Sequence, residues 1–262
     1  MRYITSLILS CLVCPSFGQN INTGSRFTGM ANSCVMLKSP YEVFHNQAGL
    51  SDISKCNLGI SYTDRFNMEE FSSKSVFLVF PFLKTVSALD YSYYGYTEYY
   101  EEAIGCSVSK NLSSKLSLGI KIKYLHSFVE RYSRHSTEYN FEVGMQYSLF
   151  KNMRLGIHTA NPVRKFNVIS STILRTGLSW QCHESILITG EFVSIENVPD
   201  FYALGISWEL YRNIFLCFGH TSIDAVMHMG LTYKYRNLSS SISLYSKDML
   251  GSSSAISVNY EF

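Results

Sequence analysis

Apolar and polar residues alternate along much of this chain, most regularly in two stretches. Between Leu116 and Tyr124 the even positions are apolar or aromatic, and the odd positions hold serine, glycine and lysine. Between Tyr139 and Leu149 the odd positions are apolar or aromatic, and polar residues or glycine fill the even ones. Successive side chains of a strand point to opposite faces of its sheet, so this period of two predicts strands with one apolar and one polar face.

Fourteen segments of this kind follow one another between residues 55 and 262, and several have the 9–11 residues that a tilted strand needs to cross a bilayer. We predict an all-β fold, a closed up-and-down antiparallel transmembrane β-barrel of about 14 strands, with 12 strands as the nearest alternative. Its apolar faces would contact lipid and its polar faces would line the lumen. The predicted strands are 55–63, 71–80, 84–94, 99–109, 114–126, 137–149, 151–160, 171–180, 185–194, 201–210, 212–221, 225–235, 237–246 and 252–262.

A motif of a basic residue, an asparagine and an aliphatic residue separates strand-like segments at four places. Its spacing follows multiples of about 20 residues, which is the length of one hairpin of two membrane-crossing strands. Asparagine tolerates the left-handed backbone of a tight turn. With fourteen strands every copy follows an even-numbered strand, so we predict short periplasmic turns there and longer outer loops, such as 64–70, at the other end. The copies are Lys110-Asn111-Leu112, Lys151-Asn152-Met153, Arg212-Asn213-Ile214 and Arg236-Asn237-Leu238.

The two ends of the sequence carry export and assembly signals. Residues 1–18 read as a signal peptide, with a basic start, an apolar run too short to span a bilayer as a helix, and small residues before a cleavage site near Gly18/Gln19. A lipoprotein signal at Cys14 is the alternative. At the other end, alternating apolar residues lead to Tyr260 and Phe262, which is typical of the signal read by the barrel assembly machinery. An ordinary edge strand would leave unpaired backbone groups, which barrel closure removes.

Composition narrows the class of protein further. The 19 tyrosines and 17 phenylalanines have a specific cause in a membrane barrel, where aromatic girdles lie at both lipid–water interfaces. A net charge of +2, scattered along the chain, gives no electrostatic footprint for nucleic acid. The cysteines beyond the signal peptide have no regular spacing, so they predict neither a disulfide framework nor a metal site.

Candidate chemistry is confined to charged residues on polar faces. No nucleophile–base pair, phosphate loop or metal-ligand spacing stands out, so we expect no enzymatic activity, cofactor or metal. Lys121 and Lys123 lie across from Glu138 and Glu142 on the adjoining strand, within cross-strand reach. Charged groups in a narrow lumen need partners, which predicts an interior network that plugs and stiffens the barrel; a conducting, selective pore is the alternative. The predicted members are Lys121, Lys123, Glu138, Glu142, Arg154, Arg175, Glu191 and Glu209, and Lys234 also falls on an inner face.

Residues 24–50 resemble the opening of FadL-like and PorV/PorQ-type outer-membrane barrels, including short members from Bacteroidota. Those proteins begin with Gly-x-Arg-x-x-Gly-Met-Gly/Ala and continue with Asn-Pro-Ala-Gly-Leu before the first strand. Here Gln47 stands at the proline of the second motif. Asn161-Pro162-Val163-Arg164 resembles a further recurrent piece of the short members. The matching N-terminal residues are Gly24, Arg26, Gly29, Asn46, Ala48, Gly49 and Leu50.

The resemblance implies an outer-membrane barrel (residues 55–262) whose N-terminal segment (19–54) tucks into or under the periplasmic mouth, with a short helix around Tyr41–Gln47. It implies an accessory of type IX protein secretion or surface attachment, or a FadL-like channel for small hydrophobic molecules; a purely structural barrel is a third reading. The expected partners are outer-membrane lipid, the assembly machinery, and either secretion-machinery or cargo proteins or a small hydrophobic ligand. The chain lacks the long outer loops of fatty-acid transporters, which favours the first reading.

Overall fold

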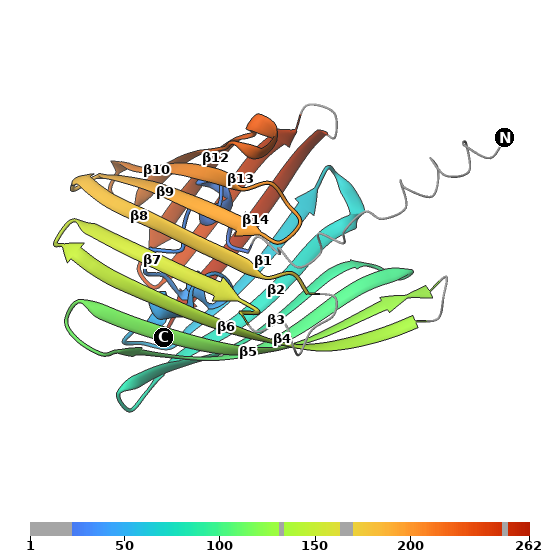
Figure 1. Cartoon of the computed structure of the whole chain (residues 1–262). Helices are drawn as coiled ribbons and strands as arrows, with labels where there is room; N and C mark the ends of the chain where they lie inside the picture. The colour runs from blue at the N-terminus through green and yellow to red at the C-terminus, as the bar shows by residue number, and fades with distance from the viewer. Residues whose placement is uncertain (1–22, 131–133, 163–169, 248–250) are drawn as a thin grey trace.

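The computed structural model describes residues 23–130, 134–162, 170–247 and 251–262. The predicted signal peptide, residues 19–22 and the Val163-Arg164 end of the resembling Asn161–Arg164 segment lie outside these ranges. Fourteen antiparallel strands each pair with their neighbours in sequence, and β1 pairs with β14, so the sheet closes into a barrel (Figure 1). The predicted fold is therefore confirmed, and the alternative of 12 strands is wrong.

The strands are β1 (Asn57–Arg65), β2 (Met68–Phe82), β3 (Thr85–Tyr96), β4 (Tyr99–Asn111), β5 (Leu116–Val129), β6 (Arg134–Phe150), β7 (Met153–Ala160), β8 (Ile173–His183), β9 (Ile186–Ile195), β10 (Phe201–Tyr211), β11 (Ile214–Thr221), β12 (Met227–Tyr235), β13 (Leu238–Lys247) and β14 (Gly251–Glu261). A 3-10 turn, η6 (Ile223–Ala225), precedes β12.

The register confirms which faces point outward and inward. Ile120 lies opposite Val143 on the outer face, and Lys121 lies opposite Glu142 on the inner face. Ile120 and Phe141 are 50% and 43% exposed, whereas Lys121 and Glu142 are 2% and 4% exposed. A slip of one residue would exchange the two sets, so the alternation of apolar and polar residues specifies this pairing. The residues on the outer face also include Leu118, Met145, Val258 and Tyr260.

One wall of the barrel is taller than the rest. Strands β2 to β6 have 15, 12, 13, 14 and 17 residues, whereas β7 has 8 and β8 has 11. All five are longer than the 9–11 residues that a tilted strand needs to cross a bilayer. In Figure 1 the hairpins β3–β4 and β5–β6 reach past the other strands at the end opposite the C-terminus. We call β2 to β6 the tall wall.

The prediction of a long loop at 64–70 is wrong. Strands β1 and β2 meet in a tight turn at Phe66 and Asn67, whose φ angles are 60° and 57°. Two consecutive left-handed residues match the twist of paired strands, so the hairpin continues to its tip and its backbone groups pair with each other instead of forming a loop.

The basic-asparagine turns all lie at the end of the barrel that carries the C-terminus, after β4, β6, β10 and β12. Their backbones differ from one another. Asn213 has the expected left-handed φ of 67°, but in the last copy Arg236 is left-handed, with φ of 51°, and Asn237 is not. In the first copy Asn111 is still part of β4. The motif therefore marks where these turns lie without fixing one turn conformation.

Residues 23–54, which we call the plug, lie inside the barrel toward the end that carries the C-terminus (Figure 1). The plug contains a short helix, α2 (Ser25–Gly29), and two 3-10 turns, η2 (Pro40–Phe44) and η3 (Gln47–Leu50), in place of the single helix expected around Tyr41–Gln47. No helix in the described ranges is long and apolar enough to cross a membrane. Two apolar clusters bury the plug, one that joins plug residues to Cys217 of β11 and Leu187 of β9, and one against the inner faces of β2 and β3.

A belt of inward-facing glycines makes room for the plug. A Cβ atom added to most of them would come closer than 3.0 Å to a plug atom, so a side chain at these places would collide with it. The plug backbone therefore replaces the side chains that fill the lumen of a small barrel. The belt residues that face the plug are Gly119 on β5, Gly144 on β6, Gly156 on β7, Gly177 on β8, Gly205 on β10, Gly219 on β11 and Gly230 on β12.

Candidate functional site

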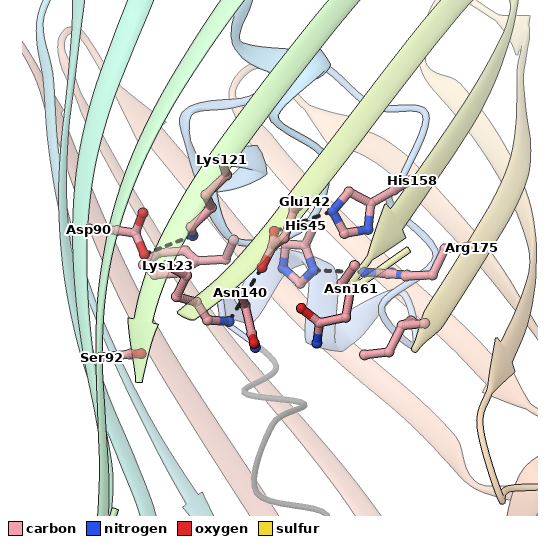
Figure 2. A pocket seen from close by; sticks show the side chains of 13 residues that line it. His45, Asp90, Ser92, Lys121, Lys123, Asn140, Glu142, His158, Asn161 and Arg175 are labelled. Atoms are coloured by element: carbon pink, nitrogen blue, oxygen red, sulfur yellow. Dashed lines mark hydrogen bonds and ion pairs between the residues drawn. The ribbon is translucent and has the colours of Figure 1, made fainter. Parts of the chain in front are cut away.

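A small polar cavity of about 70 Å³ lies on the outer side of the plug, and Figure 2 shows the charged side chains that converge on it. Phe44 and His45 of the plug line it together with inward residues of strands β3, β5, β6, β7 and β8. Each strand contributes alternate residues to the lumen, so side chains that are distant in sequence meet here. The charged and ionisable lining residues are His45, Asp90, Lys121, Lys123, Glu142, His158 and Arg175.

Lys121 forms a buried ion pair with a residue that the sequence did not single out. Its Nζ lies 2.8 Å from Asp90 Oδ2 and donates to Val43 O at 2.9 Å. The two side chains are each 2% exposed, so each charge depends on the other for compensation. Gly105, on the strand between them, has no side chain, which lets Lys121 reach across to Asp90. An acid on the inner face of β3, beside a glycine of β4, was the signal available in the sequence.

Glu142 links the barrel wall to the plug. Gln47 Nε2 donates to Glu142 Oε2 at 2.9 Å, Lys123 Nζ lies 3.5 Å from Oε1, and His158 Nε2 lies 3.3 Å from Oε2. Gln47 is the residue that replaces the proline of the resembling motif. A proline has no amide side chain to donate this bond, so the departure from the motif fits the acid that this chain carries on β6.

Arg175 and Glu191 form the second buried pair, and it holds the plug through main-chain groups. Arg175 Nε donates to Glu191 Oε1, and Glu191 Oε2 accepts from the N–H groups of Cys34 and Val35 at 2.8 and 3.0 Å. Arg175 also donates to Asn32 O at 2.8 Å. These bonds satisfy three plug groups that burial would otherwise leave without partners.

His45 is a buried part of the same arrangement. Its Nε2 lies 2.8 Å from Thr23 O and its Nδ1 lies 3.2 Å from Arg175 Nη1. A neutral ring with the proton on Nε2 fits both contacts, since the carbonyl accepts and the guanidinium donates. Burial, and then the charge of Arg175, lower the pKa of His45 to about 3.

Three other residues of the predicted network, Glu138, Arg154 and Glu209, do not contact the charged side chains around the polar cavity. Glu138 accepts from Ser170 Oγ near the outer end, and Arg154 Nη1 donates to Met36 O at 3.4 Å on the periplasmic side of the plug. Glu209 accepts from Asn213 N at 3.2 Å at a periplasmic turn. The single network expected from the sequence is therefore divided, because the plug occupies the lumen between the groups.

The N-terminal motif residues shape the plug. Asn46 caps η3 by accepting from Ala48 N at 3.1 Å, and its amide donates to Val35 O at 2.6 Å. A side chain on Gly49 would collide with Leu37 O and Glu42, and Leu50 packs in the cluster against β2 and β3. At the start of the plug, a side chain on Gly24 would press on the ring of Tyr41, and one on Gly29 would meet the backbone of Gly230. Arg26 points to the periplasmic side.

The C-terminal residues take part in barrel closure. Phe262 N donates to Cys56 O at 2.9 Å, and the Tyr260 and Phe262 rings meet edge to face with centroids 5.0 Å apart. Both rings face outward, at 45% and 61% exposure.

A larger cavity, of about 290 Å³, adjoins the polar one and shares Ile173 and Arg175 with it. Its wall is mainly apolar toward β9, β10 and η6 and polar toward β1, β12 and β13. The apolar lining residues are Ala31, Phe66, Ile173, Val193, Ile195, Phe201, Ala203, Ile223 and Val226.

The charged side chains around the polar cavity hold the plug in place. Its buried charges are occupied with each other and with plug carbonyl and N–H groups, which fixes the plug in the lumen. Among the described residues, no three histidine, cysteine or acidic side chains are placed to hold a metal ion. The described cysteines Cys34, Cys56, Cys106, Cys182 and Cys217 are free thiols.

No protein-family profile matches the sequence. No curated protein matches it either. Among solved structures, the fold is similar to the Ralstonia pickettii toluene transporter TbuX, with a TM-score of 0.69 and 10% identity over 91% of this chain and 98% of that one. A Pseudomonas aeruginosa FadL homologue gives a TM-score of 0.65 and 11% identity over 92% and 99% of the two chains. The Pseudomonas putida toluene transporter TodX gives 0.65 and 10% over 91% and 98%. At these identities the likeness shows the fold, which is that of FadL-type outer-membrane barrels.

Proposed function

We propose that this protein is a non-enzymatic outer-membrane barrel that holds partner proteins at the cell surface, as a PorV/PorQ-like accessory of type IX secretion or surface attachment. The observation that carries the proposal is the combination of a filled lumen with one wall that projects outward. A barrel of this design presents a surface for partner proteins and does not provide a path for solutes through its lumen.

The filled lumen is the first support. The plug is held by two buried ion pairs on its outer side and by backbone contact with the glycine belt. Among the described residues, the two cavities on the outer side, of about 70 and 290 Å³, share no lining residue with those of about 320 and 270 Å³ on the periplasmic side. Passage through the lumen would require breaking buried, mutually compensated charges, which is costly.

The tall wall is the second support. The face of this wall that points away from the lumen carries a row of rings in contact: Tyr93 and Tyr100 stack at 5.7 Å between centroids, and tilted contacts follow between Tyr100 and Phe128 at 5.3 Å and between Phe128 and His135 at 4.7 Å. Stacked rings lose little conformational freedom when a partner covers them, and large aromatic side chains are common anchors of protein interfaces. Residues 131–133, which connect β5 and β6, lie outside the described residues.

The test is complementation of a deletion strain with a Tyr100→Ala/Phe128→Ala variant. We expect the deletion to remove a set of proteins from the cell surface, and the variant to fail to restore them although its barrel is assembled at the normal level. The matched control is Tyr202→Ala, which removes an exposed outward ring from β10 on the opposite wall. An unchanged surface proteome in the deletion strain would refute the proposal.

A second candidate is a FadL-like role in binding or passing a small hydrophobic molecule. The observation in its favour is the partly apolar 290 Å³ cavity, which approaches the size of small-ligand sites. Two of the proteins with this fold are toluene transporters. Toluene binding by the purified barrel, weakened by Val193→Gln and unaffected by the lipid-facing Phe192→Leu, would support this role. A defect of the deletion strain in hydrocarbon uptake, with an intact surface proteome, would favour it over the accessory role.

A further inference from the structure

Charge is segregated between the two ends of the barrel. At the periplasmic end every turn except the one between β8 and β9 carries a lysine or an arginine. The basic residues there are Arg26, Lys38, Lys55, Lys84, Lys110, Lys115, Lys151, Arg154, Arg212, Lys234 and Arg236, and the acidic ones are Asp52, Glu184, Glu209 and Glu261. A concave surface lined by charge of one sign focuses its field and attracts ions of the other sign.

Two cavities open beneath the plug in this basic region. They have volumes of about 320 and 270 Å³ and share Arg26, Phe27, Lys38 and Ser39. The larger one is also lined by Lys234, Arg236 and Glu261. The smaller one has no acidic residue in its lining, which consists of Arg26, Phe27, Leu37, Lys38, Ser39, Phe150, Lys151, Asn152, Met153, Arg154, Ser179, Gln181 and Leu187.

The two arginines of the smaller cavity have no direct ion-pair partner, although the buried Glu42 is near enough to interact electrostatically with Arg154. Neither Arg26 nor Arg154 forms an ion pair with any carboxylate of the described residues. Arg26 donates to Ser207 Oγ at 3.2 Å and lies over the Phe215 ring, 5.0 Å from its centroid, while Lys234 lies 5.1 Å from the same ring. The Nε atoms of both arginines are buried without a hydrogen-bond partner. Partly buried guanidinium groups held in this way are stabilised by an anion that binds between them.

The surroundings of Lys38 agree with an excess of positive charge. Lys38 forms an ion pair with Asp52 at the rim. Burial, and then the charge of Arg154, still lower the pKa of Lys38 to about 8. The cationic form is therefore disfavoured in the absence of further negative charge nearby.

We propose that the smaller periplasmic cavity, with Arg26 and Arg154 as its main cationic groups, binds a small soluble anion that bears phosphate or carboxylate groups. A planar guanidinium group forms bidentate hydrogen bonds with either a phosphate or a carboxylate, and Lys151 adds further positive charge. Asn152 supplies a neutral donor, and Leu37, Met153 and Leu187 form an apolar side for the rest of the ligand. The cavity has a volume suited to a small molecule and faces the periplasm, which identifies that compartment as the source.

The test is calorimetric titration of the full mature chain, in a neutral detergent without lipid and at low, constant ionic strength, with tripolyphosphate and with citrate. We expect binding of at least one probe and at least a tenfold loss of affinity in Arg154→Gln, equivalent to about 1.4 kcal/mol. Arg154→Lys keeps the charge without the fork, so it should recover only part of the affinity. The matched control is Lys115→Gln, which removes the same charge from an exposed turn at the same end, outside both cavities.

Three outcomes would overturn the proposal. Equal weakening by Arg154→Gln and Lys115→Gln would show attraction by net charge without a built site. Absence of binding to either probe at millimolar concentration, with variants that show the normal shift between folded and heat-denatured bands on a gel, would also exclude the site. Binding that appears only when anionic phospholipid is added to the detergent would assign the surface to lipid headgroups and contradict a soluble ligand.

Discussion

Replacing Gly119 by alanine tests whether the plug is a fixed part of the barrel. Gly119 is an inward residue of β5 with ordinary strand geometry, and an added Cβ would come closer than 3.0 Å to the backbone of Gln47 and Ala48. Neither group is the flexible end of a side chain, so the methyl group can be accommodated only if the plug or the strand moves. Inserting a methyl group into a packed interior costs about 1–3 kcal/mol.

Gly190 provides the control for this substitution. It is an outward residue in the middle of β9, and an added Cβ would lie 3.5 Å from Leu204 Cδ2, an ordinary contact. Alanine at such a place stabilises a protein by about 0.4–1 kcal/mol, because the unfolded chain loses freedom. The difference in unfolding free energy between Gly119→Ala and Gly190→Ala should therefore be about 1.4–4 kcal/mol.

The assay is denaturant unfolding of both variants in lipid vesicles, together with conductance in planar bilayers. We expect Gly119→Ala to unfold at a lower denaturant concentration or to conduct ions, because the collision is relieved by loss of stability or by displacement of the plug. Gly190→Ala should stay closed and be at least as stable as the parent. Equal stability of the two variants, with neither conducting, would refute the close packing of plug and wall.

Three further predictions follow from the same structure. Val143→Arg places a charge on the lipid face and should lower the unfolding free energy in vesicles by about 2–4 kcal/mol if the residue lies near the midplane, whereas Val143→Leu should have little effect. Deletion of residues 24–50 removes the plug and should increase leakage of small solutes through reconstituted barrels; a folded but tight barrel would contradict a sealing role. Glu42 is fully buried, and burial raises its pKa well above the usual range, so the folded state favours the protonated acid. Its stabilising contribution is complete below the unfolded pKa of about 4.3 and is lost as pH rises toward the folded value, by at most about 1.4 kcal/mol per pH unit. Glu42→Gln should remove this decline, and unfolding curves of both proteins between pH 4 and pH 8 that run parallel would contradict it.

The sequence by itself determined the barrel. A period of two in fourteen segments specifies both the number of strands and the face that each side chain takes, because register and alternation are coupled in a closed sheet. The same pattern placed Lys121 and Glu142 in the lumen and Ile120 and Val143 against lipid. It did not reveal that the strands of one wall are longer than the rest, since residues of an extended hairpin are as polar as those of a loop.

Only the tertiary structure decided which charges meet. Lys121 pairs with Asp90 because Gly105 leaves a gap between them, and Glu142 binds Gln47 because η3 brings that residue to β6. Such contacts depend on where the plug lies within the closed barrel, and local patterns carry no such information. Closure also gathers lysines and arginines that are scattered along the sequence into a single basic region beneath the plug, since all even-numbered strands end on the same side.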